Sequence, residues 1–88
     1  MRVFLDISPY WPKDEYGQSR TVNSIYEEIK GSNNEVGRNT LRLALDGKLD
    51  RGLFANIVKL SRLLSEWSGQ EVRPSDLLKV EEDNKSNS

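Results

Sequence analysis

The 88-residue sequence contains no cysteine and no histidine. Zinc fingers, iron–sulfur clusters, disulfide frameworks and Ser–His or Cys–His nucleophile pairs each need one of these residues, so all are excluded. A metal site would need oxygen ligands alone, and no calcium loop rich in Asp and Asn is present. The adjacent carboxylates Glu27 and Glu28 point apart on a helix, so they form no acid–base pair. We expect no enzymatic activity, no cofactor and no bound metal.

Long apolar runs are also missing, since none approaches the ~20 residues of a transmembrane helix. Charges at Arg2 and Asp6 interrupt the start too early for a secretory signal peptide. We therefore expect a cytoplasmic protein without membrane contacts. A chain of this length supports one core, so residues 1–80 are predicted to form a single domain. The polar stretch 81–88 is predicted to be a disordered tail.

Apolar periodicity predicts a mainly α fold with about four helices and one short strand. The strand is expected over Arg2–Ile7, where apolar residues partly alternate with charged ones. Helical spacing and helix-ending glycines then predict helices over 19–30, 36–46, 52–68 and 74–80. Asn34 is the expected N-cap of the second helix. Trp11 and Trp67 are expected to lie in the core.

The second predicted helix divides into two faces. An apolar and small half is formed by Val36, Gly37, Thr40, Leu41, Ala44 and Leu45. The other half carries Arg38, Arg42, Asp46 and Asn39, with Leu43 at its edge. One side of this helix is therefore expected to pack on the core, while a basic, amide-bearing side faces outward.

The near-zero net charge of −1 hides an uneven distribution. Residues 1–37 carry four basic and six acidic side chains, and residues 74–88 carry two and four. Residues 38–73 carry seven basic and four acidic side chains, a net charge of +3. A basic centre between acidic flanks is the distribution expected of an anion-binding face on a nearly neutral protein.

A braced pair of helices with a polar outward face is typical of a helix-turn-helix, whose second helix enters the DNA major groove. Arginine pairs with guanine and asparagine with adenine, which favours base contacts from Arg38, Asn39 and Arg42. Thr40 is expected near a thymine methyl or the core. We predict phosphate contacts from the loop that follows the helix. The complete predicted DNA-binding set is Arg38, Asn39, Thr40, Arg42, Lys48, Arg51 and Asn34.

From Val36 to Val80 the sequence resembles the helix-turn-helix domains of phage-repressor type (Cro/repressor, xenobiotic-response-element-like), in their short bacterial and cyanobacterial form. The resemblance rests on three stretches: 36–41 as the start of a recognition helix, 52–64 as the next helix, and 68–78 as a structural signature. It implies sequence-specific duplex DNA binding in transcriptional regulation, commonly as a homodimer. We expect a repressor.

Two alternatives stay open. In a second register the recognition helix lies at about 50–59, although the apolar flank of Phe54 and Val58 argues against exposure there. In the second alternative, the chain is a protein-interaction, adaptor or antitoxin-like module that has the helix-turn-helix fold but binds DNA weakly or not at all. In either case a homodimer is expected, through the edge of the N-terminal strand or through the Phe54 and Val58 flank.

Overall fold

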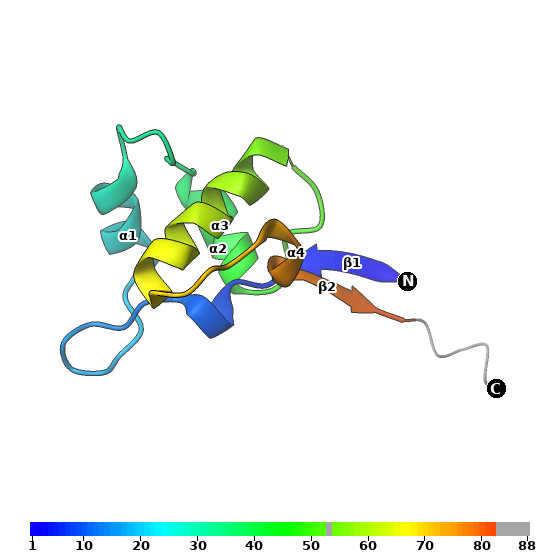
Figure 1. Cartoon of the computed structure of the whole chain (residues 1–88), viewed down its shortest axis with the longest axis horizontal. Coiled ribbons are helices and arrows are strands. Elements are labelled where there is room, and N and C mark those ends of the chain that lie inside the picture. The colour runs from blue at the N-terminus through cyan, green and yellow to red at the C-terminus, as the bar shows by residue number, and fades with distance from the viewer. Residues whose placement is uncertain (53, 83–88) are drawn as a thin grey trace.

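The computed structural model describes residues 1–52 and 54–82. Within them, a helical body carries a two-stranded ribbon that projects on the side opposite α1 (Figure 1). In chain order the elements are β1 (Arg2–Leu5), the 3-10 helix η1 (Ser8–Tyr10), α1 (Val22–Ile29), α2 (Arg38–Leu45), α3 (Phe54–Ser68), α4 (Pro74–Leu77) and β2 (Leu78–Glu81). The predicted mainly α class with an N-terminal strand is confirmed.

Helix α1 is shorter than the predicted range 19–30 because a threonine sets its start. Thr21 has an extended backbone, and its Oγ1 accepts a hydrogen bond from the N–H three residues later, at 3.1 Å. This is an N-cap. Ser19 instead forms a β-bridge with Lys13, which holds the preceding chain outside the helix. Gly31 follows the helix with φ of +84°, the left-handed conformation that glycine adopts at least cost.

Helix α2 begins two residues later than its predicted range 36–46, and its N-cap is Gly37. The expectation that Asn34 caps this helix is therefore wrong. Asn34 lies in the preceding turn, where its N–H donates to Ser32 Oγ at 3.2 Å. Val36 follows it and is buried. Because the chain must first place this valine in the core, the helix starts only after it.

Helix α3 buries Leu60 and Leu64, as its periodicity predicts. Its first turn is different, because the Phe54 side chain is 84% exposed. The interpretation that the Phe54 and Val58 flank is shielded from solvent is wrong. Leu53 lies seven residues before Leu60, so its helical spacing predicts a place on the same apolar side, but it lies outside the described residues.

The predicted last helix over 74–80 is also wrong beyond its first turn. Its start is fixed by Pro74 at the first helical position and by Asp76, whose carboxylate accepts the Arg73 N–H at 2.9 Å. The chain becomes extended at Leu78 and continues as β2. Pairing with a distant strand outweighs the local tendency to continue the helix.

Strands β1 and β2 pair antiparallel, with Val3 opposite Val80 and Phe4 opposite Lys79. β1 ends earlier than the predicted strand because η1 begins at Ser8. Residue 81 belongs to β2, so the predicted tail over 81–88 begins too early. Positions 83–88 of that tail lie outside the described residues.

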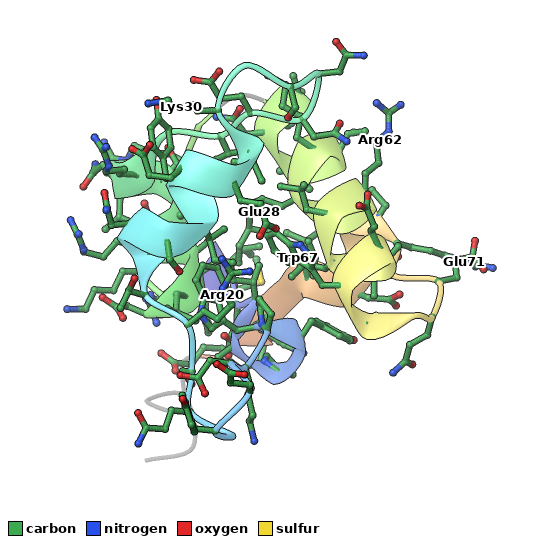
Figure 2. All side chains as sticks on the ribbon, turned by 90° about the vertical axis from the view of Figure 1, so that its left-hand side faces the viewer. Arg20, Glu28, Lys30, Arg62, Trp67 and Glu71 are labelled. Carbon is green, nitrogen blue, oxygen red and sulfur yellow. The ribbon has the colours of Figure 1, made fainter. Side chains whose placement is uncertain are left out.

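The core lies between the three longer helices, η1 and β1, and it includes Leu5, Ile7, Trp11, Ile25, Ile29, Val36, Leu41, Ala44, Leu60, Leu63, Leu64, Val72 and Leu77. Trp11 and Trp67 meet edge to face with ring centroids 6.1 Å apart. Trp11 is thus confirmed as a core residue, whereas Trp67 is partly buried and packs against the core. Figure 2 labels the ion pair between Arg20 and Glu28, whose atoms Nη1 and Oε1 are 2.9 Å apart. None of the described helices has the length and apolar character needed to cross a membrane.

Candidate nucleic-acid interface

Helix α2 has one buried side and one exposed side. Leu41 and Ala44 are fully buried, so they fix the rotation of the helix about its axis. At 100° per residue this rotation turns Arg38, Asn39 and Arg42 outward, and all three are exposed. We call these three residues the α2 outer face. Residues 38–45 include no acidic side chain, and the first carboxylate along the helix is that of its exposed C-cap, Asp46.

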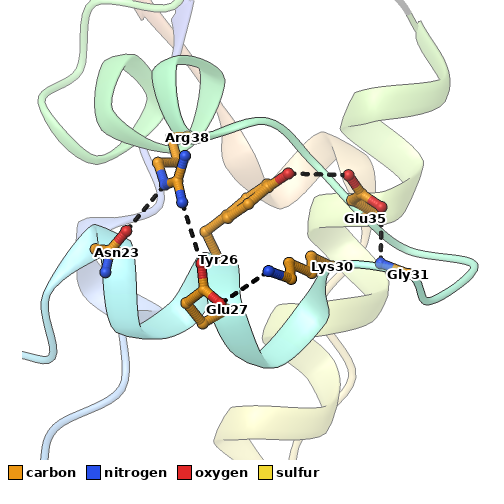
Figure 3. A network of polar contacts seen from close by, with 7 residues as sticks. All are labelled: Asn23, Tyr26, Glu27, Lys30, Gly31, Glu35 and Arg38. Carbon is orange, nitrogen blue, oxygen red and sulfur yellow. Dashed lines mark hydrogen bonds and ion pairs between the residues drawn. The ribbon is translucent and has the colours of Figure 1, made fainter.

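Arg38 is held against α1 by three separate contacts (Figure 3). Its Nε donates to Asn23 Oδ1 at 2.9 Å, and its Nη2 lies 3.1 Å from Glu27 Oε2. Its guanidinium carbon also lies 4.4 Å from the centre of the Tyr26 ring, a cation–π contact. The side chain remains half-exposed. Arg38 therefore joins α1 to α2 while some of its N–H groups stay available.

A second group of contacts fixes the connection between α1 and α2 (Figure 3). Glu35 accepts the Gly31 N–H at 2.8 Å and the Tyr26 hydroxyl at 3.2 Å. These two hydrogen bonds, with the Gly31 bond the larger cause, lower the pKa of the Glu35 carboxyl. Stabilising the charged form in this way keeps Glu35 ionised at neutral pH. The eight-residue connection over 30–37 is thus tied to α1.

Glu27 is the acidic centre of the same network. Its Oε1 lies 3.0 Å from Lys30 Nζ, and its other oxygen faces Arg38. The hydrogen bond and charge of Lys30, followed by the charge of Arg38, lower the pKa of the Glu27 carboxyl. Glu27 therefore shares its charge between two cations, and both stay partly exposed.

Arg42 and Asn39 differ from Arg38 in having no such attachment. Within residues 1–52 and 54–82, no carboxylate lies within 4.0 Å of the Arg42 guanidinium, and neither side chain is hydrogen-bonded. Both project from a helix whose opposite side is rigidly packed. Their hydrogen-bonding groups are therefore available to an external ligand.

Thr40 and Arg51 lie elsewhere among the predicted contacts. Both line a groove of about 220 Å³ bounded by β1, the loop before α3 and the first turns of α3. Most of its lining is apolar and includes Val3, Leu5, Leu49, Phe54, Ile57 and Leu78. Thr40 is half-buried, and the exposed Arg51 pairs with its neighbour Asp50, with 3.4 Å between Nε and Oδ1. Thr40 and Arg51 therefore line this groove and are not part of the α2 outer face.

The remaining predicted residues flank α2. Lys48 is exposed in the loop just beyond the C-terminal end of the helix. Asn34 is half-buried before the helix, and its buried Oδ1 has no hydrogen-bond partner within the described part of the chain. Of the seven predicted contacts, the structure thus gathers Arg38, Asn39 and Arg42 on one face, with Lys48 beyond its end.

Sequence reasoning missed the residues that hold this face in place. Asn23 and Glu27 are four residues apart in α1, so their shared side of the helix could be predicted. Their partner Arg38 is 15 and 11 residues further on, and no local pattern indicates that contact. Tyr26 lies at the helical spacing of the apolar residues Val22 and Ile29, but its ring and hydroxyl also serve the polar network.

No cluster of three or more metal-ligating side chains occurs in the described ranges. In the second register the recognition helix would occupy about 50–59, but residues 50–52 precede α3, which starts at Phe54. No family model matches the chain, and comparisons with curated proteins and with solved structures find no match.

Proposed function

We propose that this chain is a sequence-specific regulator of transcription that binds duplex DNA through the α2 outer face. The observation that carries the proposal is the pair Asn39 and Arg42, exposed and unengaged on a helix whose opposite side is fully buried. An α-helix fits the major groove, which is about 12 Å wide. A helix braced in this way presents its side chains to base edges without first having to be ordered.

Each outward residue has a role that follows from its chemistry. The Arg42 guanidinium donates to O6 and N7 of guanine, and the Asn39 amide pairs with N6 and N7 of adenine. Arg38 keeps its contacts to α1 and offers its remaining N–H groups to a phosphate. Lys48, just beyond the helix, contacts a second phosphate. Specificity thus rests on two side chains and orientation on two others.

Few base contacts on one short helix give weak binding by a single chain. We therefore expect the DNA-binding unit to be a homodimer that places two α2 helices in successive turns of the major groove. Such a dimer occupies a site of two half-sites, and occupancy of a promoter by it blocks transcription. A repressor is the expected form of regulation.

The test compares two arginine variants on a preferred duplex selected from a random pool. Arg42→Ala should weaken binding, measured by fluorescence anisotropy, by about 1–3 kcal/mol per half-site because it removes a bidentate base contact. Arg62→Ala is the matched control. Arg62 is also exposed, but Figure 2 shows it pointing outward from α3, away from α1.

Equal affinities for the Arg42→Ala and Arg62→Ala proteins would contradict the proposed role of α2. Asn39→Ala adds an independent check, because it should relax selectivity at an adenine without changing the charge. Selection of a preferred duplex with the Asn39→Ala protein then returns a degenerate base at that position.

A protein-interaction or antitoxin-like module is the second candidate function. It is favoured by the exposed apolar side chains at the ribbon end of the molecule, Val3, Phe54, Leu78 and Val80. In that case the chain gives a weak anisotropy change or none with duplex DNA, even at low salt. The DNA titration therefore separates the two candidates.

A further inference from the structure

The outer edge of β2 carries backbone groups available for hydrogen bonding. The Leu5 N–H points away from β2, because it donates to Leu49 O at 2.8 Å. Inward and outward groups alternate along antiparallel strands. The opposite residue Leu78, and Val80 two positions on, therefore direct their N–H and C=O groups outward. The Leu78 N–H already donates a hydrogen bond to Ser75 O. The outward groups that remain available on this edge are the Leu78 carbonyl and the N–H and C=O of Val80.

The corresponding edge of β1 is covered by the segment after α2. Besides the bridge between Leu5 and Leu49, the Arg2 guanidinium donates to Gly47 O at 2.7 Å. This segment occupies the position that an added strand would need. The N-terminal strand edge, expected above as a dimer contact, is therefore the less accessible of the two edges.

The sequence of β2 is complementary to itself when two copies run antiparallel. With Val80 opposite Val80 of the partner subunit, Lys79 falls opposite Glu81 of the partner subunit. The same pairing recurs on the other side of the twofold axis, so both directly opposed charge pairs are attractive. The outward N–H and C=O of the two Val80 residues then bond to each other, and the Glu82 N–H reaches the partner's Leu78 carbonyl.

The apolar side of the ribbon also continues across this axis. Val3 and Val80 are paired neighbours on one face, and they are 42% and 56% exposed. Placing the two Val80 side chains against each other joins these pairs into one stripe. Figure 1 shows the ribbon projecting beyond the helical body, which leaves room for a second copy beside β2.

We propose that two copies of this chain dimerise through their β2 edges, antiparallel and centred on Val80, to form a continuous four-stranded sheet ordered β1-β2-β2-β1. This inference deepens the proposed function and rests on its homodimeric part, but it requires no DNA. The contact is one short strand from each copy, so it belongs to the small, reversible class of interfaces. The symmetry is isologous, as in most homodimers.

The test uses sedimentation equilibrium of the full chain without DNA. The unmodified protein should approach twice the mass of one chain as its concentration rises. Lys79→Glu and Glu81→Lys should each weaken dimerisation by roughly tenfold or more, because each substitution converts two attractive pairs into two repulsive ones. An equimolar mixture of these two variants should dimerise again, since an all-acidic edge then faces an all-basic edge.

The controls repeat both charge changes on other exposed surfaces, as Lys13→Glu in the N-terminal loop and Glu66→Lys on α3. Both should dimerise like the unmodified chain, and circular dichroism confirms that every variant is folded. Three results would each overturn the proposal: an unmodified protein that stays monomeric at submillimolar concentration, single variants that dimerise normally, or a mixture that remains monomeric. DNA binding by a monomeric chain would still support the α2 interface, so the two claims fail separately.

Discussion

The two ends of the molecule expose different chemistry. At the α1–α2 end, the exposed residues are charged and amide side chains, and seven of the residues there form one polar network (Figure 3). At the ribbon end, four apolar side chains are exposed beside the charged ones of the strands: Val3, Phe54, Leu78 and Val80. A polar, partly basic helix suits a polyanion, whereas an edge strand in which apolar and charged residues alternate suits another polypeptide. The comparison shows that one small core supports two chemically different surfaces, which are the two surfaces proposed above to bind DNA and a second copy of the chain.

The largest expected effect tests whether both surfaces depend on that core. Leu41→Ala should lower the free energy of unfolding by about 2–5 kcal/mol, because it leaves a cavity beneath α2. Leu78→Ala is the matched control on the ribbon, where the side chain is already 44% exposed. Urea denaturation measures both changes. If the two variants lost the same free energy of unfolding, the ribbon end would be packed as tightly as the helical end.

The next largest effect is a difference in stability between variants of the two arginines of α2. Arg38→Ala should lower the free energy of unfolding by about 0.5–1 kcal/mol, the range of an exposed cation–π contact. Arg42→Ala should leave that free energy within about 0.5 kcal/mol of the unmodified value, as is usual for an unattached surface residue. Thermal denaturation checks the difference. If Arg42→Ala were the more destabilising variant, Arg42 would be a structural residue and unsuited to reading bases.

Acid should weaken the α1–α2 end through two carboxylates. The pKa values of Glu27 and Glu35 are lowered in the folded chain. Their stabilisation is therefore complete above the pKa of an unfolded glutamate and is lost as the pH falls through the folded values. Glu35→Gln should flatten the dependence of melting temperature on pH in this acidic range.

Raising the salt concentration should separate the contributions of Glu27 and Glu35 to stability. Glu27 is stabilised mainly by the exposed charge of Lys30, so its part should shrink as ionic strength rises. Glu35 is stabilised mainly by the Gly31 N–H, so its part should persist. An acid dependence that disappears entirely in high salt would show that the Glu35 hydrogen bonds contribute nothing to stability.

The helical end was more predictable from sequence than the ribbon end. The burial of Leu41 and Ala44 follows from a 3.6-residue period, which is a local property. Strand β2 forms because its residues pair with β1 at the other end of the chain, although a preceding proline and aspartate start a helix nearby. Such pairing between distant segments leaves no local pattern that distinguishes it from a continued helix.

The candidate site also has features that the sequence predicts and features that it does not. The outward position of Arg42 could be predicted from the helical wheel, because neighbouring apolar residues fix the buried side. The attachment of Arg38 to α1 could not, since it depends on how two helices cross after an eight-residue connection. The exposure of Phe54 was predicted incorrectly, because an apolar residue at the start of a helix need not face its core.

The central claim is that the α2 end binds duplex DNA. Its most direct test is a fluorescence anisotropy titration of the full chain on a mixed-sequence duplex at two salt concentrations. The account predicts binding at low salt, with log K falling against log salt by about 0.9 for each phosphate neutralised. No anisotropy change at low salt, or binding that is indifferent to salt, would contradict it.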